Sequence, residues 1–381
     1  MTEHYRATFL TPTPSPYMQD LFVAMARDGR IAPTVMYLER DAPGFKWAHS
    51  GLPDYSEILP GGWFNFFGAR IHANPSAIVR VLGSKPDIVV VAGYSGLTNQ
   101  ALMYWLKMVR MPWIFYGEIP GYQQRGLLGV TFRKLARFPA IHLSSGIAAV
   151  GSRAVDAYLA LAPVGKPVAN IPYYCDLSAF ASLGRTPPRG PCGPEGLLRI
   201  LYCGQLVHRK GVDILMRAFT RLVAEFGNVR LKLVGDGELK SEIIAGMSEA
   251  VRERVEFTGF LQVDELPAQF ADADVFVLPS RHDGWGVVVN QALAAGLPII
   301  CSDAVGAAVD MVVAGENGTI VPAGDEESLY RAIAELTDDP EKIERYSNRS
   351  RAMATDWTPD RGVDRWYELI ERVLRRTSTS K

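Results

Sequence analysis

Short, nearly all-apolar runs alternate with amphipathic stretches along this chain, and this alternation limits the folds that the chain can adopt. Each apolar run has four to six residues, which is typical of strands covered on both faces. In the first half the expected strands are residues 5–10, 34–38, 88–92, 113–116 and 147–150, and the expected helices are residues 17–27, 97–109 and 152–161. This alternation predicts an α/β fold with a parallel sheet and right-handed crossovers.

The same alternation returns after a Pro- and Gly-rich stretch near the middle of the chain. Residues 182–197 contain four Pro and four Gly, which cannot lie inside a helix or a central strand. Beyond this stretch, strands are expected at residues 198–203, 230–234, 255–258, 275–278 and 298–301, and helices at residues 212–226, 239–250, 264–270 and 287–295. The pattern therefore predicts a second βα domain.

The chain of 381 residues has the length of two domains of about 100–200 residues each. We expect a first Rossmann-like domain over residues 1–181, a linker over 182–197 and a second Rossmann-like domain over 198–355. The remaining residues, 356–381, are expected to form a helix that packs back on the first domain. Two such domains leave a cleft between the carboxyl ends of their sheets, where ligands of open α/β sheets bind.

Composition and charge narrow the class of protein. A content of 48% hydrophobic and 21% charged residues excludes a disordered, coiled-coil or collagen-like chain. Residues 1–175 carry a net charge of +6 and residues 176–381 a net charge of −7. A basic half favours phosphate, anionic lipid or nucleic acid as a partner, and chance drift in surface charge is the alternative.

The cysteines and the hydropathy pattern indicate a cytoplasmic chain with reduced thiols. Cys175, Cys192, Cys203 and Cys301 form no C-x-x-C pair, so neither a disulfide framework nor a structural zinc site is expected. The first residues lack the pattern of a signal peptide. No apolar run reaches the length of about 18 residues that a membrane-spanning helix needs.

The most informative stretch is residues 279–300, PSRHDGWGVVVNQALAAGLPII. Its Gly residues let the backbone approach a ligand closely, and the free N–H groups at the start of the following helix can receive phosphate oxygens. Gln291 lies eight residues after Asp283, which is about two helical turns. Both side chains can therefore line one wall of the cleft.

This stretch resembles the E-x7-E region of the retaining family-4 glycosyltransferases, which have the GT-B fold. Asp283 stands at the first Glu of that pattern, Gln291 at the second Glu and Trp285 at a Phe. The residues that match the pattern are Ser280, Arg281, Gly284, Gly286, Ala292, Ala294, Gly296 and Pro298. Length and spacing agree, and both acids are altered.

Further segments match the same family. Residues 204–211, GQLVHRKG, resemble the segment G-R-L-x-x-x-K-G, whose Arg and Lys hold the donor diphosphate. Lys210 matches the Lys, whereas Gln205 replaces the Arg and Arg209 is placed to supply the missing charge. The other matching segments are residues 234–237 with Gly235, residues 257–260 with Gly259 and Phe260, residues 171–180 at the domain junction, and, more loosely, residues 14–17 and 116–118.

The resemblance implies a GT-B enzyme whose two domains face each other across a cleft, with the donor mostly on the second domain. The residues it implies for catalysis are Asp283, Lys210 and Glu118. The residues it implies for donor binding are Gln205, Arg209, Lys210, Gly235, Gly259, Phe260, Gly284, Trp285, Gly286, Val287 and Gln291. Ser15 and Tyr17 fall on the acceptor side. Because cationic side chains and backbone donors would already stabilise the donor diphosphate, the resemblance implies that the reaction requires no metal and no cofactor.

Each of these residues also has a plain structural interpretation. Asp283 can be a helix N-cap, Gln291 a solvated helix residue and Lys210 a surface charge. Ser15 and Glu118 carry only weak local signatures. Residues 272–274, Asp-Ala-Asp, match a short metal motif but lie where a helix runs into a buried strand, so we expect a structural role for them.

We expect a retaining, metal-independent hexosyltransferase that moves a sugar from a nucleotide-sugar to a glycan or lipid-linked acceptor in cell-surface polysaccharide or glycoconjugate synthesis. The alternatives are a catalytically silent GT-B partner or scaffold protein and a sugar-nucleotide epimerase. No nucleic-acid partner is expected. Residues 125–138, RGLLGVTFRKLARF, form either a basic helix on anionic lipid at the inner face of the membrane or a helix packed on its own domain.

Overall fold

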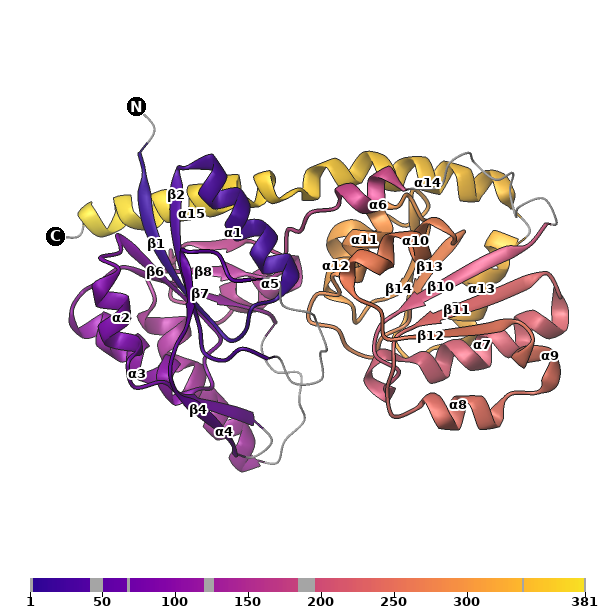
Figure 1. The fold of residues 1–381 in the computed structure, drawn as a ribbon, viewed down its shortest axis with the longest axis horizontal. Helices are drawn as coiled ribbons and strands as arrows, with labels where there is room; N and C mark the ends of the chain where they lie inside the picture. The colour runs from indigo at the N-terminus through magenta and orange to yellow at the C-terminus, as the bar shows by residue number, and fades with distance from the viewer. Residues whose placement is uncertain are drawn as a thin grey trace. The chain divides into compact units, whose positions relative to one another are not determined.

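The computed structural model describes residues 3–41, 51–66, 69–119, 127–183, 196–337 and 339–379. The chain folds as two compact units (Figure 1). Unit 1 comprises Met1–Cys175 and Pro359–Lys381, and unit 2 comprises Asp176–Thr358. The division falls six residues before the expected end of the first domain, because the Phe180 ring of α6 (Ser178–Ser182) packs at 5.3 Å on Phe270 of unit 2. Of the expected linker, residues 184–195 lie outside the described residues.

Unit 1 is built on a seven-stranded sheet in which every pairing is parallel. Its order is β3-β2-β1-β6-β7-β8-β9. The strands are β1 (Tyr5–Thr11), β2 (Ile31–Tyr37), β3 (Ser56–Ile58), β6 (Ile88–Ala92), β7 (Trp113–Gly117), β8 (Gly146–Ala149) and β9 (Val168–Asn170). The hairpin of β4 (Gly62–Phe66) and β5 (Ala69–Ala73) stands apart from this sheet. The sequence pattern did not predict β3, β4, β5 or β9.

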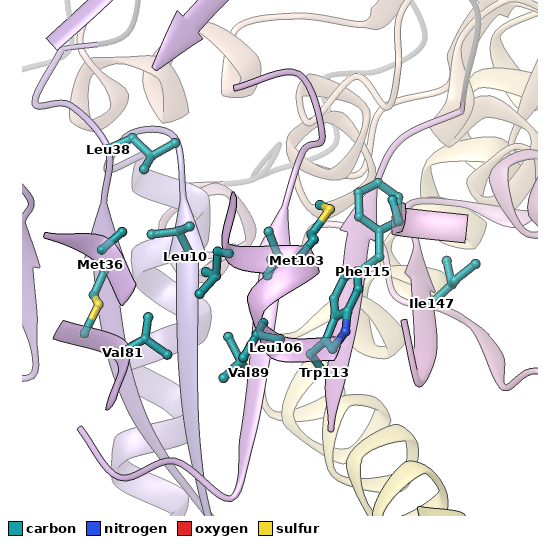
Figure 2. Close-up of a cluster of buried hydrophobic side chains, with 14 of the residues drawn as sticks. Leu10, Met36, Leu38, Val81, Val89, Met103, Leu106, Trp113, Phe115 and Ile147 are labelled. Carbon is teal, nitrogen blue, oxygen red and sulfur yellow. The ribbon is translucent and has the colours of Figure 1, made fainter. Parts of the chain in front are cut away.

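Helices of unit 1 cover this sheet. They are α1 (Pro16–Asp28), α2 (Ala77–Gly83), α3 (Leu97–Met108), α4 (Leu127–Phe138), the π-helical turn η1 (Pro139–Leu143) and α5 (Ser152–Leu159). Figure 2 shows the core beneath α2 and α3, where Trp113 and Phe115 of β7 lie near Met103 and Leu106 of α3. The core is apolar because the inner strands carry apolar residues on both faces.

The C-terminal helix α15 (Pro359–Thr379) belongs to unit 1 although it follows unit 2 in the chain. Val363, Trp366, Ile370 and Val373 recur at helical spacing and are buried, as in a helix with one core-facing stripe. The Trp366 ring lies 5.3 Å from Phe9 of β1. The helix therefore closes one face of the first sheet.

Unit 2 contains a six-stranded parallel sheet of order β12-β11-β10-β13-β14-β15. The strands are β10 (Leu198–Cys203), β11 (Val229–Val234), β12 (Val255–Gly259), β13 (Val275–Leu278), β14 (Ile299–Ser302) and β15 (Gly318–Val321). The chain moves outward from β10 in one direction and from β13 in the other, so the order reverses between these two neighbours. The predicted α/β fold of two Rossmann-like parallel-sheet domains is confirmed.

Besides α6, the described α-helices of unit 2 are α7 (Val212–Glu225), α8 (Lys240–Gly246), α9 (Glu249–Arg252), α10 (Leu266–Ala271), α11 (Val288–Ala294), α12 (Gly306–Met311), α13 (Glu326–Thr337) and α14 (Pro340–Ala354). The prediction of one helix over residues 239–250 was wrong: Met247 and Ser248 are extended, and α9 starts anew after Ser248. Among the described helices, none is both long and apolar enough to span a bilayer.

Candidate functional site

Two loops lie side by side at the carboxyl edge of the second sheet, where its strand order reverses. Residues 204–211 follow β10 and residues 279–287 follow β13, and these strands are neighbours. Gly211 has a φ of +71°, and a Cβ there would lie 2.0 Å from the carbonyl oxygen of Pro279. Only glycine permits both this conformation and this approach. Such a switch point is where open α/β sheets bind ligands.

Arg281 ties the two loops together. Its guanidinium donates to both carboxylate oxygens of Asp213, at 2.6 and 2.7 Å, and to the carbonyl of His208 at 2.7 Å. Burial works against the Asp213 charge, but the hydrogen bonds and charge of Arg281 hold the pKa of this carboxyl below its usual value. A bidentate arginine of this kind fixes geometry as well as charge.

Arg209 makes a second connection between the loops. Its Nη1 donates to the carbonyl of His282 at 3.0 Å, and its own carbonyl accepts from the Arg281 N–H at 2.9 Å. Gln205 lies at the base of the same loop, where its carbonyl accepts from the buried Tyr202 hydroxyl at 2.8 Å. Arg209 and Gln205 therefore shape the loop that presents Lys210.

The Lys210 ammonium and the Asp283 carboxylate form an ion pair across the two loops. Only 14% and 11% of these side chains are exposed. Lys210 is thus not a surface charge. Nor is Asp283 a helix N-cap: α11 begins after Val287, and the Asp283 N–H donates to the carbonyl of Ala304 at 3.0 Å. Both alternative interpretations were wrong, and the two predicted residues lie together.

Glycines hold the neighbouring loop after β11 close to the first loop. A Cβ at Gly235 would lie 2.0 Å from the Gly204 carbonyl oxygen, and Gly235 has a φ of +133°. The Gly235 N–H donates to the Gly259 carbonyl at 2.8 Å. Gly259 and Phe260 follow at the end of β12 and are partly exposed. The carboxyl ends of β10, β11 and β12 thus present one row of loops.

The segment before α11 offers free backbone donors. The N–H groups of Gly284, Trp285 and Gly286 have no acceptor within the described parts of the chain. Gly286 has a φ of +90°, and α11 begins at Val288, one residue after the expected start. Free N–H groups beside a lysine can receive phosphate oxygens.

Two predicted donor-site residues of this segment are buried. The Trp285 ring is in the core, with Nε1 donating to Asn290 at 2.9 Å and Trp357 at 5.9 Å between ring centres. Its side chain supports the loop from behind. Gln291 is 8% exposed, and its Oε1 has no hydrogen-bond partner within the part of the chain that the structure describes. Gln291 is therefore not a solvated helix residue, and its oxygen can still accept a bond.

The first unit contains a smaller polar group. Glu118 follows β7, and its carboxylate accepts from the Tyr173 hydroxyl at 2.9 Å, while its carbonyl accepts from Tyr158 at 2.7 Å. Burial and the Glu118 charge raise the pKa of Tyr173 well above its ordinary value, so Tyr173 remains a donor to Glu118. The Tyr17 ring lies 4.8 Å from Tyr173.

Ser15 is buried at the start of α1, with its carbonyl accepting from the N–H groups of Met18 and Gln19 at 3.1 Å. Its side chain makes no capping bond.

Residues 272–274 do not form a metal site within the described residues. Asp272 accepts from the Lys232 ammonium at 2.9 Å, and Asp274 accepts from the Arg199 backbone N–H at 2.9 Å. No three His, Cys, Asp or Glu side chains of the described ranges lie close enough together to hold a metal ion. Each carboxylate is engaged by a neighbouring donor.

Sequence reasoning gave no role to Asp213, Arg281 or Tyr173. Asp213 is in the first turn after Gly211, and Arg281 lies inside the matched stretch, but their pairing depends on β10 and β13 being neighbours. Tyr173 is in the matched segment at the end of the first unit, and its link to Glu118 spans 55 residues. No spacing rule predicts contacts of this kind.

Both loops lie in the part of the chain that matches a known protein family. Residues 193–353 match the family described as glycosyl transferases group 1. A GDP-mannose-dependent alpha-mannosyltransferase of Mycobacterium tuberculosis is 30% identical over 310 residues, which cover 74% of this chain and 77% of that protein. A GDP-mannose-dependent alpha-(1-6)-phosphatidylinositol monomannoside mannosyltransferase of Mycolicibacterium smegmatis is 32% identical over 165 residues. That match covers 41% of this chain and less than half, 43%, of the relative.

A solved structure matches nearly the whole chain. Sucrose-phosphate synthase of Thermosynechococcus elongatus superposes with a TM-score of 0.74, covering 98% of this chain and 100% of that one at 18% identity. At this identity the likeness shows the fold alone. It agrees with the GT-B fold that the sequence predicted.

Proposed function

Because this chain belongs to the group 1 glycosyl transferases, we propose that it transfers a sugar from a nucleotide-sugar donor to an acceptor with retention of the anomeric configuration. The observation that carries the proposal is the mostly buried Lys210–Asp283 pair at the switch point of the second sheet. It places a cation beside free backbone donors, the combination that binds a diphosphate. Gly286, with a φ of +90°, allows the backbone of this segment to turn.

In this proposal Lys210 and the N–H groups of Gly284, Trp285 and Gly286 stabilise the diphosphate as charge develops on the leaving group. These groups are held in place before the reaction, so they need not reorganise during it. Asp283 holds hydroxyls of the donor sugar. Gln291 accepts from a ribose hydroxyl through its unpartnered oxygen, more weakly than a carboxylate would.

The relative that matches three quarters of this chain is named for GDP-mannose, so GDP-mannose is the first donor to test. The other mannosyltransferase is named for a phosphatidylinositol mannoside acceptor, which supports a lipid-linked glycan as acceptor here. We assign the acceptor side to Ser15, Tyr17 and Glu118 of the first unit, with Tyr173 orienting Glu118. A lipid-linked acceptor places the protein at the inner face of a membrane.

The chemistry proposed needs no metal and no cofactor, since cationic and backbone donors meet the diphosphate. A catalytically silent partner protein is the second candidate, because both acids of the family pattern are altered at Asp283 and Gln291. The two candidates differ in turnover, because only an enzyme releases nucleoside diphosphate. An epimerase would interconvert the donor without any acceptor.

The test is a transfer assay in EDTA with GDP-mannose and other common sugar nucleotides, together with lipid-linked acceptors. We expect one donor to be consumed only when acceptor is present. The anomeric configuration of the transferred sugar in the product should be the same as in the donor. Lys210→Ala should abolish turnover. The matched control is Lys232→Ala, which removes another partly buried, carboxylate-paired lysine of the same unit. No turnover of any donor would favour the silent partner, and an inverted product would refute retention.

A further inference from the structure

The β4–β5 hairpin of the first unit exposes an unusual amount of aromatic surface. Every residue of β4, with the sequence GWFNF, is exposed, and Trp63, Phe64 and Phe66 are 48%, 47% and 43% exposed. Successive strand residues point to opposite faces, so aromatic side chains are partly exposed on both faces of this strand. Proteins rarely leave contiguous apolar surface in water unless it has a binding role.

Helix α4 extends this surface. Phe132 and Leu135 are 47% and 67% exposed, and Phe138 is also exposed. The Phe66 ring lies 5.8 Å from the Phe132 ring, which joins the strand to the helix, and Figure 1 shows α4 beside β4. The alternative in which α4 buries its apolar side chains on its own domain does not account for the exposure of these three.

The charge of this surface has one sign. The described side chains of the hairpin and of α4 include Arg70, Lys134 and Arg137 and no Asp or Glu. The Arg70 guanidinium stacks over the Trp63 ring, 3.6 Å from its centre. The nearby acid, Glu39, is occupied by Arg70 at 3.1 Å and by His72 at 2.9 Å. Aromatic side chains among arginines and lysines suit the interface of an anionic bilayer.

We propose that the β4–β5 hairpin and α4 form a docking surface for an anionic phospholipid bilayer. Phe64, Phe66 and Leu135 enter the headgroup region, and Lys134 and Arg137 meet the lipid phosphates. The two contributions add, because interfacial binding grows with buried apolar area and with attraction to anionic lipid. The surface is independent of the donor site, and docking would bring the first unit to a lipid-linked acceptor.

The experiment measures binding of the full chain to vesicles of phosphatidylcholine alone and of phosphatidylcholine mixed with phosphatidylglycerol. The wild type should bind the mixed vesicles, less the neutral ones, and progressively less as salt is raised. Lys134→Glu with Arg137→Glu should weaken binding by at least about tenfold, since each cation near the surface contributes about 1 kcal/mol. Phe64→Ser with Phe66→Ser should weaken it on both vesicle types.

Two control variants make comparable charge-reversal and apolar-to-serine substitutions at exposed residues of the second unit. Arg230→Glu with Arg345→Glu makes the same change in net charge, and Val263→Ser with Val309→Ser removes other exposed apolar side chains. Both controls should bind like the wild type. The charge-reversal pair on α4 leaves the hairpin intact, so a folding defect in the Phe variants does not decide the outcome.

Equal binding of wild type and both variants, or no binding to mixed vesicles, would overturn the proposal. So would a wild-type dimer that the Phe variants dissociate while vesicle binding is absent, since the surface would then join copies of this chain. Vesicle binding requires no transfer reaction, so its failure would leave the proposed glycosyltransferase activity untouched.

Discussion

The Lys210–Asp283 ion pair can be tested by separating its effect on stability from its effect on donor binding. The variants are Lys210→Met, Asp283→Asn and the double variant. Removing one partner of a mostly buried pair strands the other charge, which costs about 3–5 kcal/mol in a fully buried site. Because 14% and 11% of these side chains remain exposed, we expect a loss of about 2–4 kcal/mol for each single variant. The double variant should lose less than the sum by about 1.5–3 kcal/mol.

The two substitutions should affect the affinity for a nucleoside diphosphate differently: Lys210→Met should lower it, and Asp283→Asn should not. Lys210→Met removes a charge-assisted contact of about 1.5–3 kcal/mol, so the Kd for GDP should rise about 10- to 150-fold. Asp283→Asn releases Lys210 from its competing carboxylate and removes a negative charge near the diphosphate. The Asn variant should therefore bind GDP as well as or better than the wild type, although its turnover falls because the sugar contact is lost.

Calorimetric titration with GDP gives the affinities, and denaturant unfolding gives the stabilities. Unfolding of each variant must be complete and reversible for its free energy to be compared. If Asp283→Asn weakens GDP binding as strongly as Lys210→Met, the roles assigned to this pair are refuted. If the stability losses of the two variants simply add, the ion pair itself contributes nothing.

Two further predictions concern other parts of the chain. Arg281→Lys loses the bidentate bond to Asp213, so we expect a higher donor KM with a smaller change in kcat. The control is Arg217→Lys, because Arg217 also contacts Asp213 but is more exposed; it should change neither constant. Equal effects of the two substitutions would contradict a positioning role for Arg281. Burial, with the charges of Lys107 and Arg376, lowers the pKa of Lys166 to about 8. The unfolded chain therefore binds the extra proton between about pH 8 and 10, so stability should rise with pH in this window. The Lys166→Met variant should lack this rise. The measurement is the melting temperature of both proteins as a function of pH, and the same pH dependence in the two would contradict the predicted role of Lys166.

Much of the fold could be predicted because the inner strands of both sheets are continuous apolar runs. Among the strands that escaped prediction, β3 and β9 have three residues each, β15 has four, and β4 carries exposed aromatic side chains. The break between α8 and α9 depends on the extended backbone at Met247 and Ser248, which amphipathic spacing does not reveal.

The candidate site could be predicted in outline but not in its contacts. Spacing and resemblance singled out Lys210, Asp283 and Gln291, and the structure places all three, mostly or fully buried, at the carboxyl side of one sheet. The ion pair, however, needs the loops after β10 and β13 to be neighbours, and these strands are separated by two others in the chain. Trp285 stands at the Phe of the family pattern, and its buried side chain supports the loop from the core. A linear motif cannot distinguish such support from ligand contact.

A calorimetric titration of the full chain with GDP, UDP and ADP in the presence of EDTA shows directly whether these loops bind a nucleoside diphosphate. We expect one of the three to bind with a clear preference, and we expect Lys210→Met to lose this binding while Lys232→Ala keeps it. Absence of binding by all three, or binding that Lys210→Met leaves unchanged, would contradict a donor site at these loops.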